Sequence, residues 1–165
     1  MSHVLPDLVY REVGADRIDD VRVLWEALNA YHSQLSAHFA HEVDRRTFES
    51  RKREFLARAN TGKVRIDLVT AGSEGTAIAY CLSNVSAEGV AEVDSLFVDT
   101  RFRGCGIGTE LMRRALAWFR TTAATSLVVS VMHGNDKAVA FYRRFGFQPR
   151  TVVMKISPSN DGENR

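Results

Sequence analysis

The segment Arg103-Gly104-Cys105-Gly106-Ile107-Gly108 stands between an apolar strand pattern and an amphipathic helix pattern. Glycine adopts backbone angles that other residues resist, and it lets a ligand approach the main chain closely. The first amides of a helix lack intrahelical partners and lie at the positive end of the helix dipole. A glycine-rich turn that opens a helix therefore suits phosphate oxygens, and Arg101 and Arg103 add positive charge. We interpret residues 103–108 as a phosphate-cradling turn.

Two familiar phosphate motifs do not fit this turn. A dinucleotide fingerprint requires a third glycine three residues after the second, where this chain has Thr109. A nucleotide-hydrolase loop ends in Gly-Lys-Ser or Gly-Lys-Thr, and neither follows Gly108. A plain tight turn is the structural alternative, but three alternating glycines with flanking arginines before a helix favour phosphate binding.

The residues on both sides of the turn predict strands and helices. Apolar runs and period-two alternation indicate strands at residues 8–13, 64–71, 76–83, 90–98, 126–132 and 147–156. Apolar residues at helical spacing indicate helices over residues 16–35, from about 44, over 106–120, and over 135–146. The expected caps are Asp16, Asp44 and Asn135 at the helix starts and Gly146 at the last helix end.

This order of elements predicts an α/β (α+β) fold. Strands that follow one another in the middle of the chain imply antiparallel pairing, and the later strand–helix–strand implies a parallel crossover. We therefore expect a central mixed, mostly antiparallel twisted sheet flanked by helices. The length of 165 residues fits one domain. Its expected bounds are residues 1–156, with a disordered polar tail at 157–165.

Composition excludes several classes of protein. The 22 Lys and Arg nearly balance 20 Asp and Glu, so the net charge of +2 does not indicate nucleic acid or a membrane surface as partner. No apolar run reaches the roughly 18 residues of a membrane span, and the first residues do not resemble a secretory signal. Cys81 and Cys105 are too few for a disulfide scaffold or a zinc site, so we expect a cytoplasmic protein.

The segment from Val98 to Gly108 resembles the acyl-coenzyme A binding motif of the GNAT superfamily of N-acetyltransferases. That motif reads Arg or Gln, two residues, Gly, one residue, and Gly or Ala, and Arg103, Gly106 and Gly108 fill it. The segment from Asn135 to Phe147 is similar to a second family pattern, which reads Asn, spacer, Ala, spacer, Phe-Tyr, spacer, Gly-Phe. The resemblance covers residues 92–147 well and is weak before residue 64.

The resemblance implies acetyl-CoA as the acyl donor. Main-chain groups of Leu96 and Val98 would bind the pantetheine arm and the thioester oxygen. The turn would hold the pyrophosphate, and Asn135 would touch the pantetheine or the ribose side. The implied cofactor-binding residues are Leu96, Phe97, Val98, Arg103, Gly104, Cys105, Gly106, Ile107, Gly108, Thr109, Asn135 and Tyr142.

The family transfers an acyl group from a thioester directly to an amine, and the amine must first lose a proton. A lysine-like amine has a pKa of about 10.4, so a nearby base assists attack at neutral pH. The resemblance implies Tyr142 as general acid for the departing thiolate, because a phenol with a pKa of about 10 keeps its proton at neutral pH. Aromatic packing on the sheet is the alternative role of Tyr142.

Three residues are candidates for the general base. Glu92 and Asp94 are two apart on the expected strand, so they share a side, and Leu96 and Val98 should point the same way. A charged pair inside a half-apolar strand suggests function, whereas the alternative is a solvated pair at a strand edge. We prefer Glu92 slightly, since a buried carboxylate can be tuned towards neutral pH. His133 is the third candidate.

The acceptor pocket of this family often lies between the first two helices, which implies Tyr31, His32 and Phe39 as substrate-binding residues here. His38 and His41 lack a third metal ligand, so we expect no metal. The basic helix segment 45–58 carries Glu49 and Glu54 between its charges. It is therefore interpreted as a solvated face.

Three functions remain open. The first is an N-acetyltransferase that acts on a primary amine of a small molecule or a protein. The second is a catalytically silent acyl-CoA sensor, and the third is a nucleotide-binding regulator, which the mismatched phosphate motifs disfavour. The presence of both Tyr142 and Glu92 favours the enzyme. The amine, the acyl chain length and a homodimer are left open.

Overall fold

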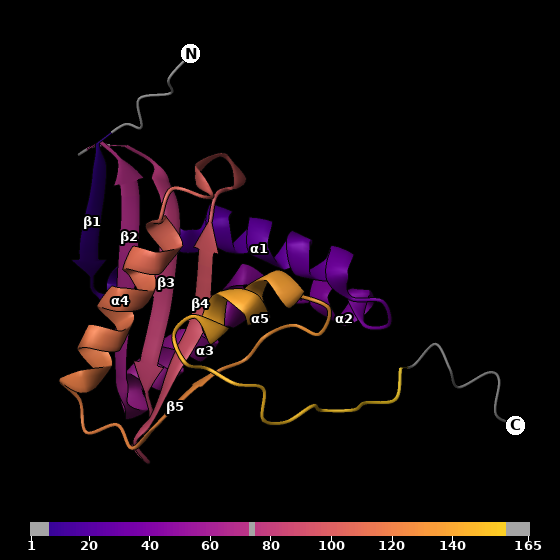
Figure 1. Cartoon of the computed structure of the whole chain (residues 1–165). Coiled ribbons are helices and arrows are strands. Elements are labelled where there is room, and N and C mark those ends of the chain that lie inside the picture. The colour runs from indigo at the N-terminus through magenta and orange to yellow at the C-terminus, as the bar shows by residue number, and fades with distance from the viewer. Residues whose placement is uncertain (1–6, 73–74, 158–165) are drawn as a thin grey trace, which may run out of the picture. The chain divides into compact units, whose positions relative to one another are not determined.

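A five-stranded sheet in the order β1-β2-β3-β4-β5 is the centre of the fold (Figure 1). The computed structural model describes residues 7–72 and 75–157. The strands are β1 (Leu8–Val13), β2 (Lys63–Ala71), β3 (Ala77–Val85), β4 (Val90–Val98) and β5 (Ser126–Val129). Each neighbouring pair is antiparallel except β4 and β5, which are parallel. The expected mixed, mostly antiparallel sheet is confirmed.

The chain divides into two compact units, and the boundary after Leu28 falls within the first α-helix. The first unit runs to Leu28 and resumes over Thr47–Ser130, and the second comprises Asn29–Arg46 and the residues from Val131. The helical elements are the 3-10 helix η1 (Ala15–Val21), α1 (Arg22–Leu35), α2 (Ala40–Asp44), α3 (Phe48–Thr61), the 3-10 turn η2 (Thr100–Phe102), α4 (Ile107–Arg120) and α5 (Asp136–Arg143). The single domain over 1–156 stays a prediction.

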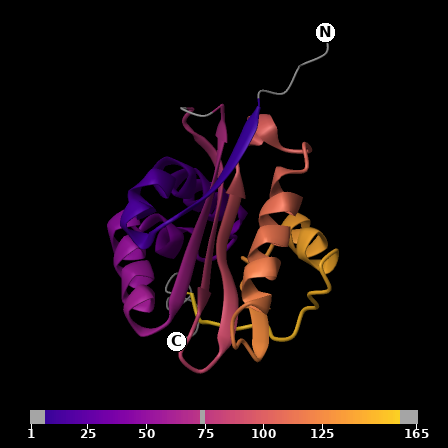
Figure 2. The ribbon, with the colours of Figure 1, turned by 90° about the vertical axis from the view of Figure 1, so that its left-hand side faces the viewer.

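In the first unit, helices cover both faces of the sheet (Figure 2). The 3-10 helix η1 and α3 pack on β2, and α4 packs on β3 and β4. The core on the η1 and α3 side consists of Ile18, Val21, Leu24, Trp25, Phe48, Phe55, Ile66, Leu68, Tyr80, Leu82 and Phe97. The residues of α4 that are buried against the opposite face are Ile107, Leu111, Met112, Ala115 and Phe119.

Two of the predicted N-caps are wrong. Gly14, not Asp16, caps the first helical element, which starts as a 3-10 helix at Ala15. Thr47, not Asp44, caps α3, and its side chain accepts a hydrogen bond from the amide of Ser50 at 3.1 Å. A threonine immediately before the first helical residue satisfies an amide that would otherwise have no intrahelical partner.

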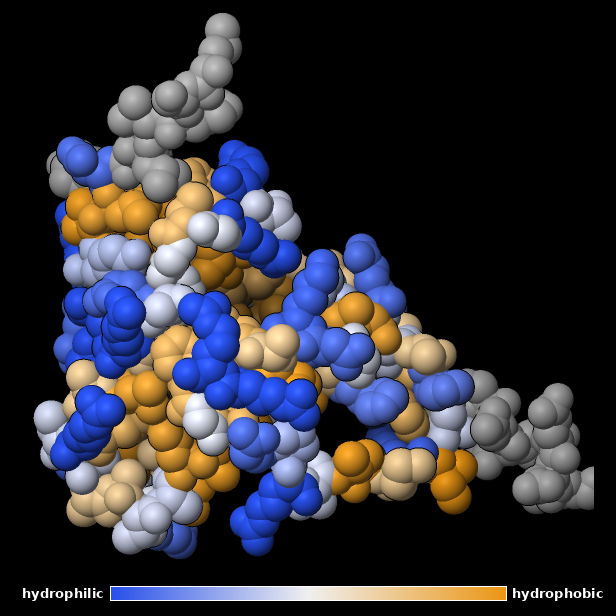
Figure 3. Space-filling model, viewed as in Figure 1, coloured by the Kyte–Doolittle hydropathy of each residue, from blue (hydrophilic) through white to orange (hydrophobic). Residues whose placement is uncertain are grey.

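The last predicted strand is absent from the part of the chain that the structure describes. Residues 147–157 have no regular secondary structure, and the strand predicted at 126–132 ends at Val129. Four apolar side chains of this segment are 70–87% exposed: Val152, Val153, Met154 and Ile156. Apolar surface is visible there beside the grey C-terminal residues in Figure 3. The predicted tail lies outside the described residues, apart from Ser157, which is buried and donates a hydrogen bond to the carbonyl of His38.

The β3–β4 ladder contains a β-bulge. Leu82 pairs with Ser95 and Ser83 pairs with Val93, so Asp94 is an extra residue on β4. A bulge places two consecutive side chains on similar sides and shifts the alternation of the strand beyond it.

None of the helices in the described segments is both long and apolar enough to cross a membrane.

Candidate active site

The turn after β4 has the backbone that its glycines predict. Gly104 and Gly106 both have φ of +80°, a left-handed conformation that L-residues with a side chain rarely adopt. Gly106 is the N-cap of α4, and the first intrahelical hydrogen bond runs from the amide of Glu110 to the carbonyl of Gly106. Ile107 is buried and anchors this end of the helix. The amides of Ile107 and Gly108 therefore lie at the positive end of a 14-residue helix.

The two arginines beside the turn differ in their contacts. The side chain of Arg101 pairs with Asp99, and this hydrogen bond lowers the pKa of the Asp99 carboxyl. Arg103 folds back on β4: its Nε donates to the carbonyl of Val98 at 2.9 Å, and its guanidinium lies over the Phe97 ring. Both cations remain next to the turn, where they add to the field of the helix end.

The half of β4 that leads to the turn is not paired with β5. The parallel ladder between β4 and β5 ends at Val93, one residue before the bulge. The predicted pantetheine-binding residues Leu96 and Val98 follow this point. An extended ligand arm can hydrogen-bond to main-chain groups along a strand edge, as an added strand would. The binding role of these two residues stays a prediction.

The prediction that Glu92, Asp94, Leu96 and Val98 share one face is wrong, because the bulge shifts the alternation. Arg58 of α3 contacts the carboxylates of both Glu92 and Asp94, so these two do share the α3 side. Phe97, however, belongs to the core on that side. Its neighbours Leu96 and Val98 therefore point to the opposite side.

The two carboxylates of β4 have different surroundings. The Asp94 side chain is 3% exposed, and its two oxygens pair with the guanidinium groups of Arg51 and Arg58. The Glu92 side chain is 23% exposed, and its Oε2 lies 3.5 Å from Asn84 Nδ2 and 3.6 Å from Arg58 Nη1. Oε1 of Glu92 has no partner among the described residues. Glu92 is thus the less enclosed of the two carboxylates.

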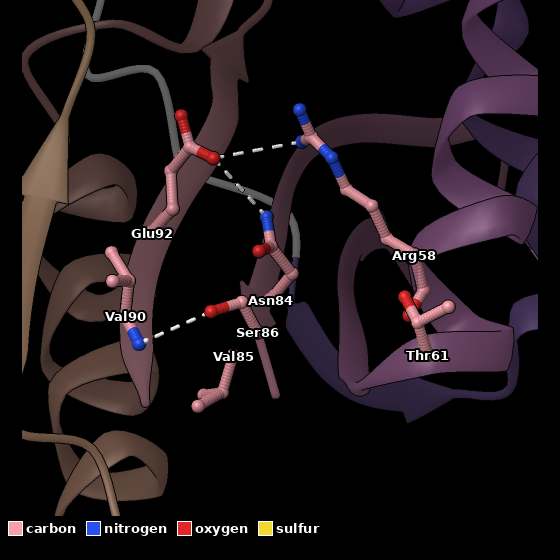
Figure 4. A pocket seen from close by; sticks show the side chains of 7 residues that line it. All are labelled: Arg58, Thr61, Asn84, Val85, Ser86, Val90 and Glu92. Atoms are coloured by element: carbon pink, nitrogen blue, oxygen red, sulfur yellow. Dashed lines mark hydrogen bonds and ion pairs between the residues drawn. The ribbon is translucent and has the colours of Figure 1, made fainter. Parts of the chain in front are cut away.

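Glu92 lines a hollow of about 180 Å³ at the end of the β3–β4 hairpin (Figure 4). The other lining residues are Arg58, Thr61, Asn84, Val85, Ser86 and Val90. In Figure 4, Glu92 extends from β4 towards Arg58 of α3 and Asn84 of β3. The hollow therefore combines a carboxylate, a guanidinium, an amide and hydroxyl groups with the apolar side chains of Val85 and Val90.

Two arginines of α3 have contacts that their sequence pattern does not predict. The prediction of a solvated face for the charges of residues 45–58 is wrong for Arg51, which is 6% exposed and pairs with Asp94. The spacing of these arginines from two phenylalanines indicates that they share the buried face of the helix. Arg51 and Arg58 follow Phe48 at three and ten residues, and Phe55 at seven, so all four lie on one helical face.

The second unit contains the other predicted site residues. Tyr142 is 9% exposed and packs edge-on against Phe141 and Phe147, with ring centroids 5.2 and 5.8 Å away. Asn135 caps α5 as predicted, and its Oδ1 accepts a hydrogen bond from the amide of Ala138 at 3.1 Å. Because Oδ1 is used in this cap, the side-chain nitrogen Nδ2 of Asn135 is the group that can donate to a ligand.

The predicted acceptor residues also lie in the second unit. Tyr31 and His32 are neighbours in the last turns of α1, with ring centroids 6.3 Å apart. Burial, aided by the charge of Arg46, lowers the pKa of His32. Phe39 precedes α2, and the Lys155 ammonium lies 5.9 Å from its ring centroid. His133 is in the loop between β5 and α5. The described residues contain no group of three side chains arranged to hold a metal.

Comparison with known proteins identifies the class. The model of the Acetyltransferase (GNAT) family matches residues 24–147, which is most of the chain. The match includes the glycine turn, β4 with its bulge, and the Asn135–Phe147 motif. The chain belongs to the GNAT family of acetyltransferases.

Two curated relatives match shorter parts of the chain. An uncharacterized N-acetyltransferase of Methanocaldococcus jannaschii is 38% identical over 72 residues, which is 44% of this chain and 32% of that protein. The peptidyl-lysine N-acetyltransferase YjaB of Escherichia coli is 39% identical over 56 residues, which is 34% of this chain and 35% of that protein. The aligned part spans about a third of each relative.

Solved structures show the same fold. A putative acetyl transferase from Pyrococcus furiosus aligns with a TM-score of 0.68 at 19% identity, over 91% of this chain and 99% of that one. The aminoglycoside N-acetyltransferase AAC(6')-Iy in complex with CoA aligns with a TM-score of 0.61 at 14% identity, over 90% and 97%. At these identities the likeness establishes the fold.

Proposed function

We propose that this protein is an N-acetyltransferase that moves an acetyl group from acetyl-CoA to a primary amine by direct attack. The observation that carries the proposal is the pair of left-handed glycines, Gly104 and Gly106, that opens α4 directly after β4 in a chain of the GNAT family. The donor groups fit the cofactor, since amides at a helix start and adjacent arginines suit a pyrophosphate. A structural relative with this fold binds CoA.

In this proposal, Glu92 accepts the proton that the acceptor ammonium must lose. The amine nitrogen then forms a bond to the thioester carbonyl carbon, and main-chain donors of β4 near Leu96 stabilise the negative charge on the carbonyl oxygen. When the carbon–sulfur bond breaks, its electron pair leaves with the sulfur. Tyr142 donates the proton that the sulfur takes up. Asn135 and the turn residues from Arg103 to Thr109 hold the donor.

The hollow beside Glu92 is the proposed end of the acceptor site, because a base must lie near the amine that it deprotonates. Its carboxylate, amide and hydroxyl groups can form hydrogen bonds with an amine that carries further polar groups. Tyr31, His32 and Phe39 are proposed to shape another part of the acceptor site. Relatives act on peptidyl-lysine and on aminoglycosides, so small molecules and protein amines both belong in the test.

The test supplies acetyl-CoA with a panel of amines and follows release of free thiol. We expect Glu92→Gln and Tyr142→Phe each to lower the rate by about two to four orders of magnitude, while acetyl-CoA affinity is retained. Tight acetyl-CoA binding without thiol release for any amine would instead support the silent sensor. Loss of acetyl-CoA binding in Tyr142→Phe would show that Tyr142 holds the donor rather than acting as an acid.

A further inference from the structure

The bulge at Asp94 turns two consecutive side chains of β4 towards the same side of the sheet. Asp94 reaches Arg51 and Arg58 of α3. Ser95 Oγ lies 2.6 Å from the hydroxyl of Tyr80, which belongs to the core beneath α3. In a regular strand these neighbours would point to opposite faces. The extra residue is thus what brings a carboxylate to α3 without turning Phe97 out of the core.

Arg51 also binds the main chain of the bulge. Its Nη2 donates to the Asp94 carboxylate and lies 3.4 Å from the Asp94 carbonyl oxygen. Asp94 has no paired residue on β3, so this carbonyl is outside the regular ladder there. Arg58 binds the second carboxylate oxygen. We call Asp94, Arg51 and Arg58 the Asp94 clamp. The two arginines of α3 bind the Asp94 carboxylate, and Arg51 also contacts the Asp94 carbonyl.

Stability alone does not account for this arrangement. Two nearly buried charges are costly to remove from water, and a well-packed apolar pair of similar size is often as stable. Arg51 Nε is also buried without a hydrogen-bond partner among the described residues, which adds to the cost. The attraction of Asp94 outweighs burial and raises the pKa of Arg51, so the cation persists. The neighbouring positions Phe48 and Phe55 on the same helical face are apolar.

We propose that the Asp94 clamp is a positioning device that holds the β4 bulge, and with it the main chain from Ser95 to Val98 against which acetyl-CoA binds. Asp94 is then a positioning residue rather than the base. This inference rests on the proposed function for its effect on catalysis. Without the clamp, the bulge can migrate along β4, and migration past Leu96 and Phe97 would exchange the faces of these two residues.

The chain offers a matched control in a second buried ion pair. Asp67 of β2 is 1% exposed and accepts hydrogen bonds from Arg65 and from Arg114 of α4. It differs from Asp94 in one respect that matters here, because it pairs regularly with Cys81 in the β2–β3 ladder. Asp67→Asn therefore removes a buried anion of the same kind without touching the β4 bulge.

The experiment compares Asp94→Asn and Asp67→Asn in the full chain. Amide hydrogen exchange of residues 94–98 and kcat/KM for acetyl-CoA are measured well below the unfolding temperature of each variant. We expect faster exchange over 94–98 in Asp94→Asn only, together with a fall of about a hundredfold in kcat/KM, as for a misplacement of about 1 Å. Asp67→Asn should lose stability but keep both values. Arg58→Gln, which removes one exposed arm, should give a smaller change in the same direction if Asp94→Asn does not fold.

Two results would overturn the proposal. If Asp94→Asn loses stability but keeps its exchange over 94–98 and its kcat/KM, the clamp is only structural. If Asp94→Asn instead loses kcat and the acidic limb of the pH–rate profile with unchanged exchange, Asp94 is the proton acceptor. Hydrogen exchange needs no activity, so the clamp is still tested if the unaltered protein releases no thiol and the proposed function fails.

Discussion

At the scale of single residues, burial separates side chains of the same type. Glu92 and Asp94 are two apart on one strand, yet one lines a hollow and the other is enclosed by two guanidinium groups. The two cysteines differ in the same way. Cys81 is fully buried next to Ser83, and burial raises the pKa of its thiol to about 12. Cys105 is partly exposed in the turn.

The cysteines give a direct test of the turn. A thiolate is the reactive form, so at pH 8 we expect iodoacetamide to modify Cys105 in the folded protein and to modify Cys81 only after unfolding. Acetyl-CoA should slow the modification of Cys105, because Cys105 is part of the proposed pyrophosphate turn. The measurement is the adduct count by intact-protein mass spectrometry, with and without acetyl-CoA and urea.

The control ligand is S-acetylpantetheine, which lacks the pyrophosphate and the nucleotide of acetyl-CoA. It should protect Cys105 poorly. Equal labelling of Cys105 with and without saturating acetyl-CoA would contradict the placement of the pyrophosphate at this turn. Labelling of Cys81 in the folded protein would contradict its burial.

At the scale of elements, the glycine turn depends on a backbone conformation rather than on crowding. A Cβ at Gly106 would meet no atom within 4 Å, but the φ of +80° makes any side chain there strained. Gly72, in the turn after β2, has a φ of +81° and equally open surroundings. The two positions therefore offer the same backbone strain, one at the proposed phosphate turn and one far from it in sequence.

We expect Gly106→Ala and Gly72→Ala to lose about the same stability, roughly 1–2 kcal/mol each, from the cost of a left-handed alanine. Only Gly106→Ala should weaken acetyl-CoA binding, because relief of the strain displaces the amides at the start of α4. Thermal unfolding and the Kd for acetyl-CoA by calorimetry give the two quantities. An unchanged Kd in Gly106→Ala would remove the turn from the binding site.

Elements with a strong local signal were predictable from the sequence. The bounds of β1 and β4 match the structure, because their apolar patterns end at clear turn residues. The start of α5 was also correct, since Asn135 is a good N-cap. The bulge was not predictable, because an extra residue leaves no mark in a strand pattern that already alternates imperfectly. Its consequence was the wrong face for Leu96 and Val98.

The error in α3 has a different origin. Charged residues are rarely buried, so the basic segment 45–58 was interpreted as solvated. The partner that makes burial of Arg51 tolerable is Asp94, which is 43 residues away in sequence. Only the tertiary fold brings the two together. For the candidate site, the sequence thus identified the glycine turn and Glu92 but not the cations that surround the carboxylates.

At the scale of the whole molecule, the main discrepancy between pattern and structure is the C-terminal segment. Residues 147–156 have the apolar composition of a strand but no ladder, and four of their apolar side chains are largely exposed. At the end of this segment Lys155 forms an ion pair with Glu42 and lies over the Phe39 ring, and Ser157 donates a hydrogen bond to the carbonyl of His38. The exposed residues Val152, Val153 and Met154 precede these contacts, and the exposed Ile156 lies between Lys155 and Ser157.

Limited trypsin treatment tests this segment. We expect the first cut after Arg150, which is exposed and outside any helix or strand, well before cuts in β2 such as that after Arg65. The fragments are identified by mass spectrometry over a time course, and Arg150→Gln should delay the first cut. Protection of Arg150 to the same degree as Arg65 would show that the segment forms the strand that its sequence pattern predicts.

The bulge in β4 also has a consequence for how this strand can vary among descendants of the gene. Val93 and Ser95 already pair with adjacent residues of β3, so loss of the single codon for Asp94 would restore an unbroken ladder. Every remaining side chain of β4 would keep its present face. Glu92 and Phe97 would stay opposite Asn84 and Tyr80 of β3. A deletion that the sheet tolerates would therefore leave both ends of the strand in place and remove only the anion that Arg51 and Arg58 bind.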